Sequence, residues 1–119
     1  MPDNGNVRIR ELLQYIEEGR IIDAMKEFYA DGVVMEEPAS GRTEGLESNL
    51  ERERQFLESV AEFKRFEARN VAEGPGSSFY ENVMAWRDVD GNEIELEQAV
   101  AAEWKDGKIV RERFYYATA

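Results

Sequence analysis

Residues 93–105 alternate between apolar and polar side chains, and this run constrains the fold more than any other segment. Its even positions hold the large apolar residues Ile94, Leu96, Val100 and Trp104. The odd positions from 93 to 103 hold only glutamate and alanine. Because successive side chains of a strand point to opposite faces of a sheet, the run predicts a strand whose even side faces the core.

Turn signals on both sides of this run predict neighbouring antiparallel strands. Asp90-Gly91-Asn92 precedes the run and Asp106-Gly107 follows it, and both sequences are typical of tight hairpin turns. We therefore expect three further strands, at residues 63–73, 79–89 and 108–117.

The first half of the chain has the periodicity of helices. Apolar residues recur at helical spacing in three segments, so we expect helices at residues 7–18, 20–30 and 44–62. A short strand at 33–37, ended by Pro38, and a loop at 39–45 connect the second helix to the third. The third helix carries Arg52 and Arg54 between acidic residues, which is typical of a solvated face.

This order of elements predicts an α+β fold formed by a single domain over residues 1–119. We expect three N-terminal helices that pack on one face of a curved, mostly antiparallel sheet. No stretch approaches the roughly 18 apolar residues of a membrane span. We therefore expect a cytoplasmic protein with no membrane contact.

The composition narrows the chemistry of this domain. The chain has no cysteine and no histidine, and its 26 acidic and 15 basic residues give a net charge of −11. Acid–base chemistry must then use carboxylates, tyrosines or lysines. We expect no metal and no cofactor, because the preferred transition-metal ligands are absent and no loop has the spacing of a calcium-binding loop. The acidic balance also argues against nucleic acid as a partner.

The faces of the last strand depend on the hairpin at Asp106-Gly107, because a shift of one residue exchanges inside and outside. A two-residue turn pairs Trp104 with Ile109. In that register Arg111 and Arg113 point inward, together with Tyr115.

We favour the alternative, a three-residue loop with a bulge, which pairs Trp104 with Lys108. It turns four other residues inward, namely Val110, Glu112, Phe114 and Tyr116. Burying one carboxylate beside a pocket costs less free energy than burying two adjacent arginines.

The resulting inner face of the sheet is apolar with three exceptions. The same alternation, continued across the turn at Asp90-Gly91-Asn92, places Tyr80, Asn82, Met84 and Trp86 on this face. Its polar residues are Asn82, Gln98 and Glu112. A few polar groups in an apolar concavity are typical of a small-molecule site, although inward polar residues are also often structural. We expect a small apolar ligand here, with Met84, Trp86, Val100 and Phe114 among the binding residues.

The outer face of the sheet favours a homodimer. It combines the small residues Ala99 and Ala101 with Arg111, Arg113 and Tyr115, in a setting rich in glutamate, and Ile109 is expected beside them. Small side chains and acid–arginine complementarity suit the packing of two sheets. A solvated face with cross-strand ion pairs is the alternative interpretation.

Two segments carry a family resemblance. The first runs from Ile22 to Pro38 and is followed by Ser40-Gly41 and Gly45, and the second runs from Asp106 to Tyr116. Together they resemble the nuclear-transport-factor-2-like superfamily, in particular its ketosteroid isomerases and SnoaL-like polyketide cyclases. The resemblance implies a cone-shaped α+β roll that is usually dimeric, with a pocket between the helices and the concave face of the sheet. The superfamily contains enzymes and non-enzymes alike.

The resemblance also implies roles for single residues. Glu37, just before Pro38, stands at the position of the proton-shuttling base of the ketosteroid isomerases. Tyr29 and Tyr116 match aromatic pocket positions, and Met35 lies on the same strand face as Glu37.

Other family positions differ in this chain. Tyr15 is the only candidate for the oxyanion-binding tyrosine of the first helix. Glu53 stands where a supporting tyrosine would lie on the third helix. The position of the family's protonated acid falls near Val100, so that donor is missing.

The leading hypothesis is an isomerase-like or cyclase-like enzyme in which Glu37 removes a proton next to a carbonyl group. Desolvation in an apolar pocket raises the pKa of a carboxyl toward neutrality, as such a base requires. Tyr15, Asn82 or Gln98 would donate to the developing enolate, and Glu112 would act as a second, protonated carboxyl. The alternative is a non-catalytic member of the fold that binds an apolar ligand or serves in dimerisation.

Overall fold

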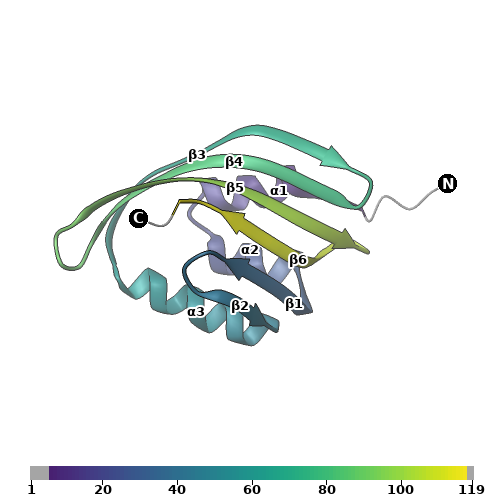
Figure 1. Cartoon of the computed structure of the whole chain (residues 1–119), viewed down its shortest axis with the longest axis horizontal. Helices are drawn as coiled ribbons and strands as arrows, with labels where there is room; N and C mark the ends of the chain where they lie inside the picture. Colours follow the sequence, from purple (N-terminus) through teal and green to yellow (C-terminus); the bar gives the residue numbers. More distant parts are fainter. Residues whose placement is uncertain (1–5, 118–119) are drawn as a thin grey trace.

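The computed structural model describes residues 6–117, which form three helices and one six-stranded sheet (Figure 1). The helices are α1 (Ile9–Glu17), α2 (Ile21–Phe28) and α3 (Leu46–Glu58). The strands are β1 (Tyr29–Glu37), β2 (Gly41–Glu44), β3 (Val60–Gly74), β4 (Ser77–Asp88), β5 (Glu93–Lys105) and β6 (Lys108–Tyr115). Within the described residues, no helix is long and apolar enough to cross a membrane.

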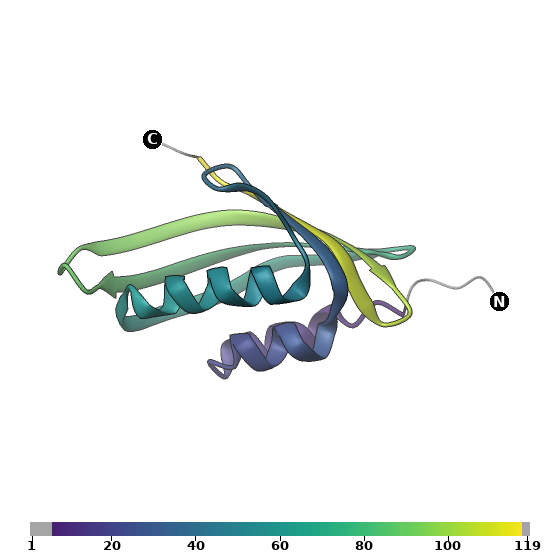
Figure 2. The ribbon, with the colours of Figure 1, turned by 90° about the horizontal axis from the view of Figure 1, so that it is seen from below.

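The sheet has the strand order β2-β1-β6-β5-β4-β3. All neighbours are antiparallel except β1 and β6, which are parallel. The strands curve, and the three helices lie on the same side of the sheet (Figures 1 and 2). This arrangement confirms the α+β fold that the order of elements predicts and the roll that the family resemblance implies.

The core lies between the apolar sides of the helices and the inner face of the sheet. The buried apolar residues of the helices are Ile9, Leu12, Leu13, Ala24, Met25, Phe28 and Leu50. They pack with strand residues that include Val33, Val100, Trp104 and Ile109. Burial of each large side chain contributes roughly 1.5–3 kcal/mol relative to leaving it exposed, so this layer holds the helices against the sheet.

The largest differences from the sequence-based expectation occur in three regions. The loop expected at 39–45 contains β2, which pairs with β1. The strand expected at 33–37 begins at Tyr29, directly after α2. The third helix ends at Glu58 and not near residue 62, because the chain turns at Ser59, whose hydroxyl donates to the carbonyl of Phe56, and β3 begins one residue later.

The hairpin between β5 and β6 combines features of both expected registers. Asp106 and Gly107 have φ angles of 52° and 80°, so they form a two-residue turn with both residues in the left-handed region. Trp104 therefore pairs with Ile109, and the expected pairing with Lys108 is wrong. Ile109 is fully buried and does not lie on the outer face.

A bulge one step along β6 then restores the predicted faces. Glu103 pairs with Arg111, so Val110 is an extra residue in the ladder. Beyond it Glu112 pairs with Ala102 and Phe114 with Val100. The fully buried carboxyl is thus Glu112, while the two arginines of β6 stay outside the core cluster.

Candidate functional site

A cavity of about 760 Å³ lies between the helices and the inner face of the sheet. The turn between α1 and α2, the second half of α3 and strands β1, β3, β4, β5 and β6 contribute to its walls. Most of the expected site residues line it, namely Tyr29, Met35, Glu37, Glu53, Asn82, Met84, Trp86, Gln98 and Phe114. At one end the rings of Phe56 and Trp86 pack edge to face, 5.2 Å apart.

Four expected residues do not line this cavity. Tyr15 packs edge to face on Phe28 and lies under the Arg20 guanidinium, so it belongs to the contact between α1 and α2. Val100 and Glu112 are buried in and beside the core. Tyr116 lies beyond the end of β6, and its hydroxyl donates a hydrogen bond to Glu37, which lines the cavity.

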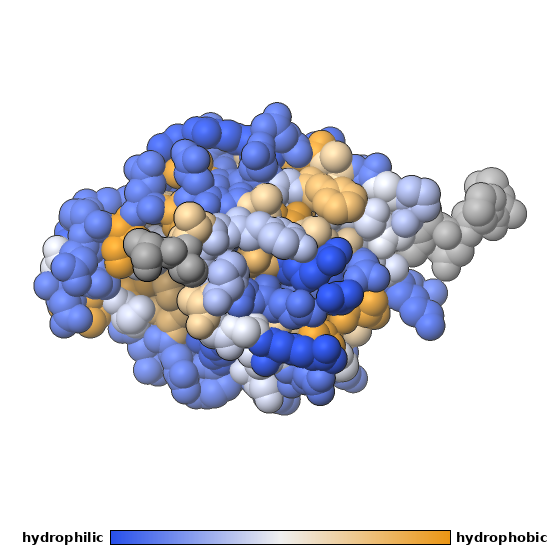
Figure 3. All heavy atoms as spheres, viewed as in Figure 1, coloured by the Kyte–Doolittle hydropathy of each residue, from blue (hydrophilic) through white to orange (hydrophobic). Residues whose placement is uncertain are grey.

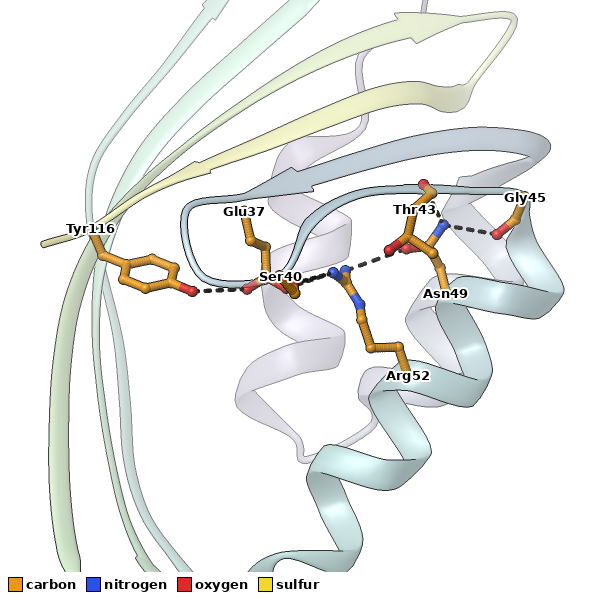
Figure 4. A network of polar contacts seen from close by, with 7 residues as sticks. All are labelled: Glu37, Ser40, Thr43, Gly45, Asn49, Arg52 and Tyr116. Atoms are coloured by element: carbon orange, nitrogen blue, oxygen red, sulfur yellow. Dashed lines mark hydrogen bonds and ion pairs between the residues drawn. The ribbon is translucent and has the colours of Figure 1, made fainter. Parts of the chain in front are cut away.

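Glu37 is held by three neighbours at the end of β1 (Figure 4). Its Oε2 lies 2.7 Å from Nη1 of Arg52 and accepts a 3.2 Å hydrogen bond from the Ser40 hydroxyl. The Tyr116 hydroxyl donates to its Oε1 at 3.4 Å. Both oxygens of this carboxylate are therefore engaged within the protein.

Arg52 is the residue that joins α3 to this wall, and it does not lie on the solvated face that its sequence context predicts. Besides Glu37, its guanidinium donates to the Ser40 hydroxyl at 3.0 Å and to Oδ1 of Asn49 at 3.3 Å. Asn49 is buried, and its amide donates to the carbonyls of Thr43 and Gly45. The network fixes α3 to β2 and to the end of β1 (Figure 4).

Glu53 follows Arg52 on α3 and lines the cavity without a hydrogen bond or ion pair in the described part of the chain. Burial raises the pKa of its carboxyl to about 7, and the charge of Glu37 adds to the shift while that of Arg52 opposes it. A carboxyl of this kind is partly ionised near neutral pH and is free to accept a proton.

Glu112 lies deeper, beside the cavity, and is fully buried. The Tyr29 hydroxyl donates a hydrogen bond to its Oε1. Burial raises the pKa of Glu112 to about 7, against the effect of this hydrogen bond, and the charges of Glu53 and Glu37 add to the rise. In the residues that the structure describes, no group of three or more acidic side chains is placed to hold a metal ion.

Asn82 and Gln98 are cross-strand partners on the floor of the cavity. Nε2 of Gln98 donates to Oδ1 of Asn82 at 3.3 Å. The other side of the Asn82 amide, Nδ2, is buried and has no partner among the described residues. A buried donor without a partner costs roughly 1–3 kcal/mol, and this donor belongs to a side chain that lines the cavity.

Tyr80 is a cavity residue that was expected only as part of the inner face. It lies two residues before Asn82 on β4, on the same face, and also lines the cavity. Burial raises the pKa of its hydroxyl, and the nearby Glu112 adds to the rise, so the phenol stays protonated. The sequence could have indicated this position, because residues two apart on a strand point to the same face and lie roughly 7 Å apart. Tyr80 is therefore expected beside Asn82 on the inner face.

The chain is similar to proteins of one fold family. The SnoaL-like domain family matches residues 9–112. A protein provisionally described as a SnoaL-like polyketide cyclase from Mesorhizobium loti has a TM-score of 0.77 at 18% identity, covering 90% of this chain and 94% of that one. An NTF2-like protein of unknown function from Burkholderia pseudomallei has a TM-score of 0.81 at 16% identity, covering 96% and 91%.

A third similar structure is TerC co-crystallised with polyporic acid, with a TM-score of 0.74 at 15% identity, covering 90% of this chain and 89% of that one. No curated protein matches the chain. The structural likenesses establish the fold, and the match over residues 9–112 establishes the family. The chain belongs to the SnoaL-like domain family.

Proposed function

We propose that this protein is a cofactor-independent enzyme that moves a proton next to the carbonyl group of an apolar substrate bound in the cavity. The observation that carries this proposal is that Asn82 and Glu53 line one cavity, while within residues 6–117 neither Nδ2 of Asn82 nor the Glu53 carboxyl has a hydrogen-bond partner. A hydrogen-bond donor and a base that share one apolar cavity are the two groups that enolisation requires.

Glu53 is the base in this proposal. Its ionised carboxylate takes a proton from the carbon next to the carbonyl group, and the electrons of that C–H bond form an enolate. Asn82 Nδ2 and the Tyr80 hydroxyl donate to the enolate oxygen, and Glu53 then returns the proton to the same or a conjugated carbon. No oxidant or reductant is consumed.

Glu37 has a supporting role in this scheme, in place of the role of base that the family resemblance implies. Its carboxylate is engaged by Arg52, Ser40 and Tyr116. Because both oxygens already have partners within the protein, neither is free to take a proton from a substrate. Glu37 instead positions Arg52 and raises the pKa of Glu53.

Hydrogen–deuterium exchange of a simple apolar ketone tests the proposal. With 2-tetralone in D₂O, NMR should show faster loss of the α-protons with the protein than in buffer alone. Glu53→Gln should slow the catalysed exchange by roughly 10²–10⁴-fold, and Asn82→Leu by roughly 10²–10³-fold. Glu58→Gln, at the exposed end of the same helix, is the matched control and should leave the rate unchanged.

Calorimetric binding separates this proposal from a non-catalytic ligand-binding module. Polyporic acid, the compound in the TerC crystals, is a suitable second probe. Binding of either compound without catalysed exchange, or exchange that is unaffected by Glu53→Gln, would show that the cavity binds but does not catalyse through Glu53.

A further inference from the structure

The walls of the cavity between the helices and the sheet are rich in aromatic side chains. They include Tyr29, Phe56, Tyr80, Trp86 and Phe114, which come from α3 and from strands β1, β4 and β6. The face of an aromatic ring attracts a cation that lies within roughly 6 Å of the ring centre. Such walls suit an apolar ligand with a positive charge as well as a neutral one.

The positively charged side chains that line the cavity are already paired with acids of the chain. They are Arg52, Lys64 and Arg65. Arg52 pairs with Glu37, while Lys64 and Arg65 each pair with an exposed glutamate of the sheet. Within residues 6–117, the cavity walls therefore offer a ligand anion no cation that lacks an acidic partner.

Glu53 differs from the other acids of the cavity. Glu18 and Glu37 form ion pairs with arginines, and Glu17 is exposed at the end of α1. Glu53 is half-buried and has neither a hydrogen bond nor an ion pair within the described part of the chain. A carboxylate withdrawn from water is costly unless a cation or a donor compensates it, so a ligand cation would lower the free energy of this site.

The electrostatic setting of Glu53 is negative on balance. The carboxyls of Glu37 and Glu112 lie close enough for their charges to act with that of Glu53, and Arg52 is a positive neighbour. The whole chain carries a net charge of −11, and hydrophilic residues surround small apolar groups on the side of the molecule shown in Figure 3. A field of this sign raises the local concentration of cations.

We propose that the cavity binds apolar amines in their ammonium form. The carboxylate of Glu53 accepts a hydrogen bond from the ammonium N–H, and the aromatic walls contact the charged group and its hydrocarbon skeleton. An amine held in this way occupies the place of a ketone substrate, so it is a competitive inhibitor of the proton transfer. The binding does not depend on the proposed function, whereas the inhibition rests on it.

Three compounds with one hydrocarbon skeleton measure the preference for charge. 2-(Dimethylamino)tetralin is a cation at pH 8, because alkylamines have a pKa of roughly 10, while 2-tetralol is neutral and tetralin-2-carboxylate is an anion. Burial raises the pKa of Glu53 to about 7, so this carboxyl is mostly ionised at pH 8. Calorimetry should then show roughly tenfold tighter binding of the amine than of the alcohol, with the carboxylate weakest.

Two variants and a change of pH assign this preference to Glu53. Glu53→Gln should weaken binding of the amine roughly tenfold at pH 8 and leave binding of the alcohol nearly unchanged. Glu17→Gln removes an exposed acid that lines the same cavity, and this matched control should keep the affinity for the amine. In the unaltered protein, the preference for the amine over the alcohol should largely disappear at pH 5, where Glu53 is protonated.

An amine that binds no more tightly than the alcohol at pH 8 would overturn the inference. Equal losses of affinity in Glu17→Gln and Glu53→Gln would also overturn it, because they would indicate general attraction by the negative surface. Failure of the proposed function has a different signature, since the amine would then bind through Glu53 although no exchange of 2-tetralone is catalysed. Where exchange is catalysed, the amine should inhibit it and excess 2-tetralone should relieve the inhibition; binding without inhibition would place the amine outside the cavity.

Discussion

Arg52 Nη1 lies 2.7 Å from Oε2 of Glu37, and this ion pair joins α3 to the end of β1 at the wall of the cavity. The two side chains are 25% and 26% exposed, so the pair contributes about 1 kcal/mol to stability at most. Both partners also act on the carboxyl of Glu53, whose pKa is raised chiefly by burial. The charge of Glu37 raises the pKa of Glu53, and that of Arg52 lowers it.

Removal of either partner should therefore shift the pKa of Glu53, in opposite directions. Glu37→Gln removes a negative neighbour and should lower the pKa from its value of about 7. Arg52→Gln removes a positive neighbour and should raise it. Carbon-detected NMR titration of the Glu53 carboxyl measures both shifts. Shifts of the same sign in the two variants would mean that loosening of the network, and not charge, controls this carboxyl.

The stability of the protein should fall as the pH rises from about 4.5 to about 7. Burial raises the pKa of Glu53 and of Glu112 from 4.5 to about 7, so the folded state binds more protons than the unfolded state in this window. The stability that these groups add is fully present below the unfolded-state pKa and is lost by about pH 7. Each carboxyl accounts for at most about 3 kcal/mol.

Urea unfolding at pH 5 and pH 8 checks this dependence. The double variant Glu53→Gln/Glu112→Gln keeps neutral side chains at both positions, and its stability should change less between the two pH values than that of the unaltered protein. Glu73→Gln, an exposed change on β3, should follow the unaltered protein. If the free energy of unfolding changed equally between pH 5 and pH 8 in all three proteins, neither buried carboxyl would titrate in this range.

The hydrogen bond from Tyr29 to Glu112 should oppose protonation of the carboxyl. Tyr29→Phe removes this donor, so the pKa of Glu112 should rise further. The loss of a hydrogen bond to a buried acid should also destabilise the protein by about 1–3 kcal/mol. NMR titration of Glu112 together with urea unfolding measures the two effects. A lowered pKa would show that water replaces the tyrosine hydroxyl at this carboxyl.

The fold was predictable because its periodicities are strong. The alternation over residues 93–105 corresponds to β5 with the same bounds, and the inner residues of β4 pair with those of β5 as expected. The hairpin at Asp106-Gly107 shows where this reasoning stops. The cost of burying two arginines correctly predicted that Glu112 and Phe114 point inward. In the structure, a two-residue turn at Asp106-Gly107 followed by a bulge at Val110 gives these residues that orientation.

The candidate site was predictable on the sheet and less so on the helices. Strand alternation identifies Asn82 and Gln98, because period-two geometry fixes which face a residue occupies. It does not report which helix residue packs over that face. Arg52 had the sequence context of a solvated residue and instead binds Glu37, while Tyr15 packs against Phe28. Both outcomes depend on the docking of helices, which local sequence does not specify.

Deletion of Val110 should leave the fold intact. In the bulge, Val110 and Arg111 together face Glu103, so removal of Val110 leaves Trp104 paired with Ile109 and Glu103 with Arg111 in a regular ladder. Every side chain beyond the deletion keeps its face, and the loss of stability should be no more than about 2 kcal/mol, within the ordinary range for single changes.

Deletion of Glu97, an outward residue in the regular ladder of β5, is the matched control. It inverts the faces of half a central strand and should unfold the protein. Urea unfolding and amide NMR spectra distinguish the two variants, and an unfolded Val110 deletion would mean that the bulge itself is required for the curvature of the sheet.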